Sequence, residues 1–267
     1  MCGIAGYITN QKVDKVSISK VVELLGRRGP DANGYFNTAF GGKNYGLIHS
    51  RLSIIDLDER ANQPYQFQNL ALTFNGEIYN YLEVRENLIK QGYQFETASD
   101  TEVLIKGWHA KGVKILDELE GMWAFALFNK NTGETTLCRD RFGEKPLYVL
   151  QTDGELFFGS EIKVLPVLSG KPLEKNMDQA YRYLVNTHKS LNKYNETFYK
   201  GVNEVKPGEM WTIKNGDTNT YKYWKPAYKP KPTTEEQAIE KIREGLIQSV
   251  KLRMRADVPL AFCLSGG

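Results

Sequence analysis

The chain has 267 residues, which is enough for one large domain and part of a second. Its 35 basic and 32 acidic residues give a formal net charge of +3, so charge offers no argument for a nucleic-acid or membrane-surface partner. The three cysteines and three histidines are scattered, so we expect neither a disulfide framework nor a metal site. The scattered cysteines indicate cytosolic thiols, so we expect a cytoplasmic protein, and no apolar run approaches the length of a membrane span.

Hydrophobic periodicity predicts groups of strands and helices along residues 1–160. The expected helices are 18–25, 81–91 and 100–111, and Gly29-Pro30 ends the first of them. The expected strands are 4–9, 45–49, 52–56, 70–74, 122–129, 135–139, 147–151 and 156–159. Two groups of strands with helices between them indicate packed sheets covered by helices, which is an α+β layered domain.

The stretch 225–232 is polar and proline-rich, as a linker between domains would be. After it, Thr234 and Gln237 form a capping-box pattern ahead of a helix with one apolar face. That face consists of Ile239, Ile242, Leu246, Val250 and Met254. An apolar strand is expected at 258–264. Because this helix and strand need a sheet to pack on, we expect a second domain that is truncated.

The first residues, Met1-Cys2-Gly3, allow a particular kind of nucleophile. If Met1 is removed, Cys2 carries both a thiol and a free α-amine. The reference pKa of an α-amine is about 8, so at neutral pH a useful fraction can accept the thiol proton. The alternative interpretation is that these residues merely begin a buried strand.

Three further sites in the sequence each allow two interpretations, one structural and one functional. Asn75-Gly76 is typical of a tight hairpin turn, but it could also supply two donors to a developing oxyanion. Arg51 interrupts an apolar stretch. It is either a charged residue on the surface or a guanidinium whose paired N–H groups bind an α-carboxylate. Asp100 could cap a helix, a role that Ser99 could also fill, or it could bind an ammonium group.

Together these motifs resemble the glutamine-dependent asparagine synthetases, and the resemblance runs from residue 2 to the last residue. The segments that carry it are Cys2–Ile4, Arg28–Asp31, Ser50–Ile54, Asn75–Asn80, Ser99–Glu102, Gly121–Ala126, Arg139–Tyr148, Gly159–Glu161 and Pro207-Gly208. Each motif is weak alone, but their number and order make the resemblance specific.

The resemblance implies a class II glutamine amidotransferase of the N-terminal-nucleophile hydrolase fold. That fold is a four-layer αββα sandwich of two mostly antiparallel sheets. The first helix and strand of an α/β nucleotide-binding domain would come after it. The implied organisation is a glutaminase domain at 2–224, a linker at 225–233, and the start of an ATP-dependent synthetase domain at 234–267.

The resemblance also implies roles for individual residues. Cys2 would be the nucleophile, with Asn75 and Gly76 as the oxyanion hole. The glutamine pocket would consist of Arg51 on the carboxylate, Glu77 and Asp100 on the amine, and the backbone of Leu52, Ser53 and Ile54, beside Asn75 and Gly76. The tail Leu264, Ser265, Gly266 and Gly267 would begin a loop around the pyrophosphate of ATP.

By resemblance, the glutaminase half needs no cofactor, and the synthetase half uses ATP and magnesium to amidate aspartate with the released ammonia. An alternative is that another carboxylate, such as a sugar uronic acid, receives the ammonia. A third interpretation is a non-catalytic binding domain, against which the intact site residues argue. We expect the chain to hydrolyse glutamine without forming asparagine; the sequence leaves a homodimer open.

Overall fold

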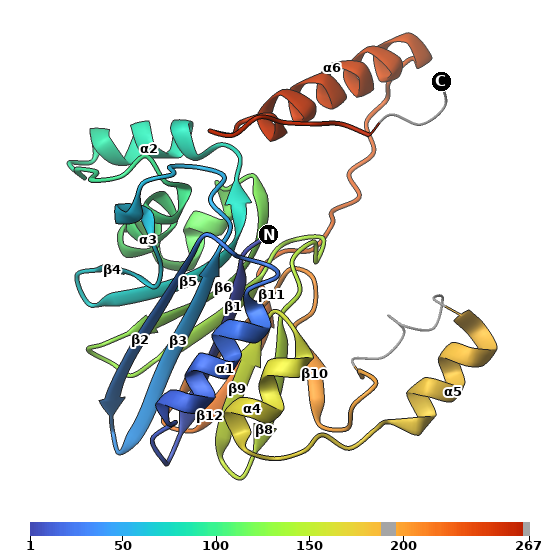
Figure 1. Cartoon of the computed structure of the whole chain (residues 1–267). Helices are drawn as coiled ribbons and strands as arrows, with labels where there is room; N and C mark the ends of the chain where they lie inside the picture. Colours follow the sequence, from blue (N-terminus) through green and yellow to red (C-terminus); the bar gives the residue numbers. More distant parts are fainter. Residues whose placement is uncertain (188–195, 264–267) are drawn as a thin grey trace.

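The computed structural model describes residues 1–187 and 196–263, and its centre is a pair of six-stranded sheets (Figure 1). All strand pairs within the sheets are antiparallel. The first sheet has the order β10 (Val202–Glu204), β8 (Tyr148–Thr152), β9 (Glu155–Gly159), β1 (Gly3–Thr9), β3 (Lys43–Arg51) and β2 (Ala32–Phe40). The second has the order β12 (Asp217–Lys222), β11 (Glu209–Lys214), β7 (Thr135–Arg139), β6 (Gly121–Asn129), β5 (Leu70–Ile78) and β4 (Tyr65–Phe67).

Alternation along each strand determines which residues lie between the sheets and which lie outside them. In β1, Ile4 and Ile8 belong to a core shared with Ala71 of β5 and Phe128 of β6, so they face the other sheet. Tyr7 belongs instead to a core with the helices on the outer face. A hydrogen bond of 3.3 Å from Thr73 Oγ1 to the carbonyl of Ile48 joins β5 to β3 across the gap.

Helices cover both outer faces. The first sheet carries α1 (Lys15–Leu25) and α4 (Leu165–Ser169), whose buried residues share a core with β1 and β3. The second carries α2 (Tyr81–Lys90) and α3 (Asp100–Lys111) over β5 and β6. Asp14 caps α1 through the amide of Ser17 (2.7 Å). The predicted four-layer α+β sandwich is therefore confirmed.

Several expected elements differ from those observed. The strand predicted at 52–56 is wrong: these residues form a loop, because Asp56 adopts a left-handed conformation (φ 52°) that ends extended pairing. The edge strand β2, the short β4 and the strands after 159 were not predicted, nor were α4 and α5 (Met177–Asn186). In β2 the residues alternate only between half-buried and exposed, so its hydrophobic signal is weak.

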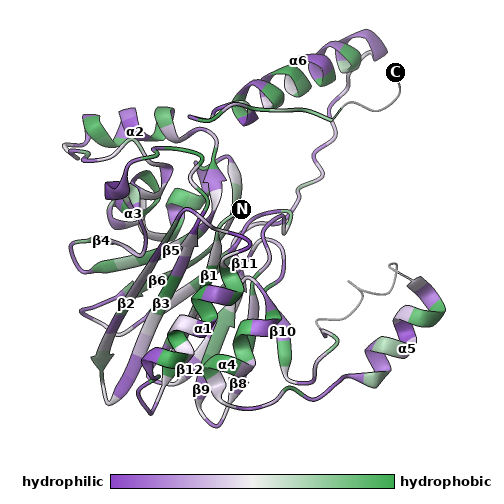
Figure 2. Cartoon of the chain, in the orientation of Figure 1, coloured by the Kyte–Doolittle hydropathy of each residue, from purple (hydrophilic) through white to green (hydrophobic). Residues whose placement is uncertain are grey.

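The predicted helix after the linker is present as α6 (Glu235–Arg253). In its capping box the amide of Gln237 donates to Thr234 Oγ1, and the amide of Thr234 donates to Gln237 Oε1. Figure 2 shows apolar residues along α6, which lies apart from the sheets, and Ile242 and Leu246 are exposed. The expected strand at 258–264 is not formed over its described residues 258–263, because no neighbouring strand pairs with them. No helix in the described ranges is long and apolar enough to cross a membrane.

Candidate active site

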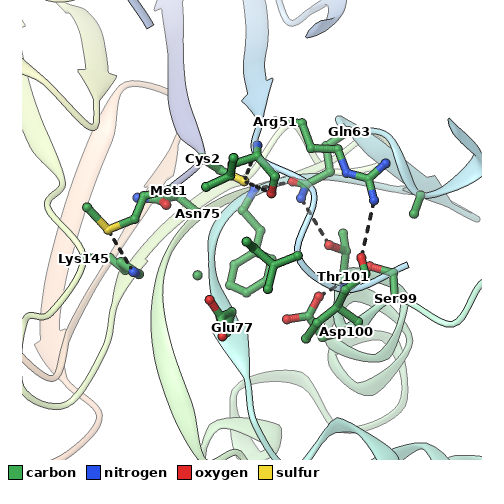
Figure 3. Close-up of a pocket in the computed structure, with 16 residues that line it drawn as sticks. Met1, Cys2, Arg51, Gln63, Asn75, Glu77, Ser99, Asp100, Thr101 and Lys145 are labelled. Carbon is green, nitrogen blue, oxygen red and sulfur yellow. Dashed lines mark hydrogen bonds between the residues drawn. The ribbon is translucent and has the colours of Figure 1, made fainter. Parts of the chain in front are cut away.

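A pocket opens where the two sheets meet the loops at one end of the sandwich (Figure 3). Side chains an even number of residues apart along a strand point to the same face. Cys2 lies two residues before Ile4 and Asn75 four residues after Ala71, and Ile4 and Ala71 face the core between the sheets, so both side chains lie on the inner side. The predicted site residues that line this pocket are Cys2, Arg51, Leu52, Ile54, Asn75, Gly76, Glu77 and Asp100. Ser53 does not line it, and the tail Leu264–Gly267 lies outside the described residues.

The thiol of Cys2 lies against the backbone of Leu52. Leu52 donates its amide to Sγ at 3.4 Å, and Sγ is 3.6 Å from the Leu52 carbonyl. Burial raises the pKa of the Cys2 thiol, while burial lowers the pKa of the Met1 α-amine. A thiol in this environment therefore needs a nearby base to become a nucleophile.

Asn75 lies within β5, opposite Ala124, and Gly76 lies opposite Trp123. The hairpin-turn interpretation of this pair is therefore wrong. The Asn75 side chain is only 1% exposed, and neither its nitrogen nor its oxygen forms a hydrogen bond with any described part of the chain. Such a group costs about 1–3 kcal/mol when buried. An unsatisfied donor beside a nucleophile is what an incoming oxyanion requires.

Gly76 is required at its position for a steric reason. A Cβ added there would lie 2.2 Å from the carbonyl oxygen of Met122 and 2.5 Å from the ring of Phe74. The backbone of β5 can therefore approach β6 and the pocket closely only because position 76 has no side chain.

Arg51 is only 5% exposed, so the interpretation as a surface charge is wrong. Its guanidinium donates to the carbonyls of Asp58 (2.9 Å) and Ile55 (3.4 Å), and also to that of Asp56. A further bond of 2.8 Å reaches Asn62 Oδ1. These bonds fix the plane of the guanidinium at the pocket wall, where its charge attracts an anionic group.

Asp100 is the first residue of α3, and Ser99 is its cap, accepting from the amide of Thr101 at 3.1 Å. Asp100 instead accepts a hydrogen bond of 2.9 Å from the amide of Ile78. Burial and, to a smaller extent, repulsion from Glu77 raise the pKa of Asp100 to about 7; burial also raises the pKa of Glu77. Two such carboxyls on one pocket wall favour a cationic ligand group.

Comparison with known proteins agrees with this geometry. Residues 1–224 match the family of glutamine amidotransferase domains, and residues 241–267 match the asparagine synthase family. The chain belongs to the glutamine amidotransferase family. The chain is 35% identical over its whole length to asparagine synthetase [glutamine-hydrolyzing] 1 of Bacillus subtilis (strain 168), covering 42% of that relative.

A second relative, putative asparagine synthetase [glutamine-hydrolyzing] 2 of Methanocaldococcus jannaschii, is 34% identical over the whole chain, which covers 55% of it. The chain thus spans about half the length of these curated relatives. Among solved structures, glutamine phosphoribosylpyrophosphate amidotransferase of B. subtilis superposes with a TM-score of 0.61 at 21% identity, covering 84% of this chain and 49% of that one. That likeness supports the two-sheet fold.

Two further residues, Gln63 and His49, support the pocket, although neither was assigned a role from the sequence. Gln63 bridges its walls, because its Oε1 accepts from the amide of Phe74 (2.6 Å) and its Nε2 donates to Thr101 Oγ1 (3.1 Å). Buried His49 lies 3.2 Å from the Phe74 carbonyl, and burial lowers its pKa to about 3, so it is neutral. No motif spacing in the sequence indicated either role.

Some motifs that carried the resemblance hold the backbone of the site. Arg28 Nε donates to the carbonyl of Cys2 at 3.0 Å, and Asp31 Oδ2 accepts from the amide of Ser53 at 2.7 Å. Lys145 lines the pocket, and its amide donates to Asp140 Oδ2 at 2.9 Å. Within the described residues, no group of three or more His, Cys, Asp or Glu could hold a metal ion.

The Asp100 carboxyl gives a pH-dependent prediction for glutamine binding. A protonated Asp100 cannot pair with an ammonium group, so affinity should weaken as the pH falls below about 7 and should level off near the affinity of Asp100→Asn. In Asp100→Asn, KM should rise by roughly thirtyfold or more, because losing the partner of a buried charge costs about 2 kcal/mol or more. Calorimetry at pH 6 and 8 and steady-state kinetics measure these effects.

The Asp100→Asn chain itself is the control for the pH effect, since its affinity should not change between pH 6 and 8 for this reason. Its thermal unfolding should change little, because Asn can still accept from the amide of Ile78. A large loss of stability with an unchanged KM would show that Asp100 is purely structural.

Proposed function

We propose that residues 2–224 hydrolyse glutamine to glutamate and ammonia, with Cys2 as the nucleophile. The observation that carries this proposal is the buried, unsatisfied Asn75 amide lining the same pocket as the Cys2 thiol. An unpaired donor in a pocket is available to an oxygen of the bound molecule, and in the pocket that holds the thiol it fits an oxyanion hole.

In the proposed reaction, Met1 is removed and the α-amine of Cys2 takes the thiol proton. Sγ then attacks the side-chain carbonyl carbon of glutamine, and the carbonyl oxygen becomes an oxyanion held by Asn75 and Gly76. The C–N bond breaks, and ammonia leaves with a proton from the amine. Water then cleaves the thioester, which releases glutamate and regenerates the thiol.

The charged groups of the pocket support free glutamine as the substrate. Arg51 offers a positive charge for the α-carboxylate, while Glu77 and Asp100 offer negative charge for the α-ammonium. Leu52 and Ile54 line the wall between these groups.

The larger activity of which this reaction would be part is the amidation of aspartate. The match of residues 241–267 to the asparagine synthase family and the names of the relatives support it. We assign 225–233 as the linker and 234–267 as the start of the synthetase domain. ATP with magnesium would activate aspartate there, and Leu264–Gly267 would begin its phosphate loop.

A glutaminase assay on the chain tests the first half of the proposal. Glutamine should yield equal amounts of glutamate and ammonia. Glutaramic acid, which has the same side-chain amide but no α-amine, should yield far less, because nothing then pairs with Glu77 and Asp100. Equal turnover of both compounds, or no turnover of glutamine, would contradict the proposal.

A further inference from the structure

Two residues that come after α6 contact segments that adjoin the lining of the glutamine pocket, although the linker separates them in sequence from the amidotransferase domain. Arg255 donates to the carbonyl of Tyr79, just beyond β5, at 2.7 Å. The same guanidinium forms a two-pronged ion pair with Glu83 of α2, with bonds of 2.6 and 2.5 Å. The guanidinium of Arg253 also lies 4.9 Å from the ring centroid of Tyr79.

Asp257 forms the second contact, with the loop at residues 54–56. Its amide donates to the carbonyl of Ile54 at 2.9 Å, and its Oδ2 accepts from the amide of Asp56 at 2.7 Å. Ile54 lines the pocket. Two residues before it, Leu52 contacts the thiol, and three residues before it, Arg51 carries the pocket's positive charge. Asp257 thus binds the loop that shapes the glutamine site.

Asp56 is the residue at which these contacts converge. Its left-handed backbone (φ 52°) is strained for a residue with a side chain, so its hydrogen bonds must hold it in place. The Asp56 carbonyl accepts from Arg51, and its Oδ2 accepts from the amide of Ala98 at 2.6 Å, two residues before Asp100. The only side chain bound to its amide within the described residues is that of Asp257.

We infer that Asp257 is a positioning residue for glutamine binding, acting through Asp56 on Arg51 and on the segment that leads to Asp100. This inference rests on the proposed function and adds that glutamine affinity depends on residues 255–257 being docked. Because coupling between two equilibria is reciprocal, bound glutamine should also tighten this docking. The segment beyond the linker would thereby sense whether the glutamine site is occupied.

Steady-state glutaminase kinetics on the full chain test the inference. In Asp257→Ala, KM for glutamine should rise about fivefold or more, a typical coupling between sites, while kcat changes less than about twofold. Asp257→Asn should restore KM most of the way, because its Oδ1 can still accept from the Asp56 amide. Arg243→Ala is the matched control, since Arg243 lies on α6 and its one ion pair with a described residue is with Glu240 of the same helix (2.8 Å).

The outcomes separate this inference from the proposed function. If the unmodified chain and Arg243→Ala are active but Asp257→Ala has their KM, the positioning role is wrong and the glutaminase stands. If no chain turns over glutamine, the proposed function itself fails. Asp257 is exposed, so its loss should not unfold the protein; Arg255→Ala, which removes the other contact, should also raise KM.

Hydrogen exchange gives a readout that does not depend on turnover. With glutamine bound to a Cys2→Ala chain, the amide of Asp257 should exchange more slowly than without glutamine. In Asp257→Ala, the amide of Asp56 should exchange faster than in the Arg243→Ala control. Unchanged exchange at both positions would overturn the inference.

Discussion

Replacing Cys2 by alanine is expected to reduce glutamine hydrolysis by on the order of 10⁴-fold or more, because the covalent route through a thioester is lost. The other two thiols cannot replace it. Cys138 is buried in the core, where burial raises its pKa far above its usual value, and Cys263 lies beyond α6. Ammonia release and labelling with a glutamine-like electrophile measure the effect.

Cys263→Ala is the matched control, since it removes an exposed thiol and should leave the activity unchanged. The labelled, active chain should begin at Cys2 by intact mass, because a peptide amide at position 2 cannot act as a base. Label on Cys263, or turnover in Cys2→Ala close to that of the unmodified chain, would show that another group attacks the amide.

Replacing Asn75 by alanine should lower kcat by about a hundredfold or more, equivalent to about 3 kcal/mol, with a smaller change in KM. The reason is that the amide stabilises charge that exists chiefly in the transition state. The same substitution should not lower the free energy of unfolding through lost hydrogen bonds, because the side chain makes none with the described residues. Asn75→Asp should be worse, since it places a negative charge beside the oxyanion.

Asn69 provides a control with the opposite expectation. It lies in the turn between β4 and β5, where its Nδ2 donates to Asn129 Oδ1 at 3.0 Å. Asn69→Ala should therefore lower the unfolding temperature and leave kcat unchanged. Stopped-assay kinetics and thermal unfolding of both variants decide the matter; an unchanged kcat in Asn75→Ala would mean that its amide takes no part in the reaction.

The sequence predicted those parts of the fold whose signals are local. The capping box of Thr234 and Gln237 and the helix it begins are confirmed, because their geometry involves neighbouring residues only. The layered α+β architecture is confirmed for a similar reason, since strand alternation and helix periodicity each identify one buried face.

The features that could not be predicted depend on contacts between distant segments. Residues 52–56 have the composition of a strand, yet the Arg51 guanidinium binds the carbonyls of Ile55 and Asp56 and a loop results. Asn75-Gly76 has the composition of a turn, yet its pairing with β6 keeps it extended. The bonds of Asp257 to Ile54 and Asp56 span about two hundred residues of sequence, which no local pattern encodes.

The position of Arg255 and Asp257 has a consequence for building chimeras between amidotransferases. The amidotransferase match ends at residue 224, yet Arg255, which binds Tyr79, and Asp257, which binds Ile54 of the pocket lining, lie about thirty residues later. If an amidotransferase domain from another protein replaced residues 1–224, positions 255 and 257 would still come from this chain. The crossover point of such a chimera would therefore need to lie after Asp257 rather than at residue 224. The exchanged block would then carry the arginine and aspartate that bind Tyr79, Ile54 and Asp56.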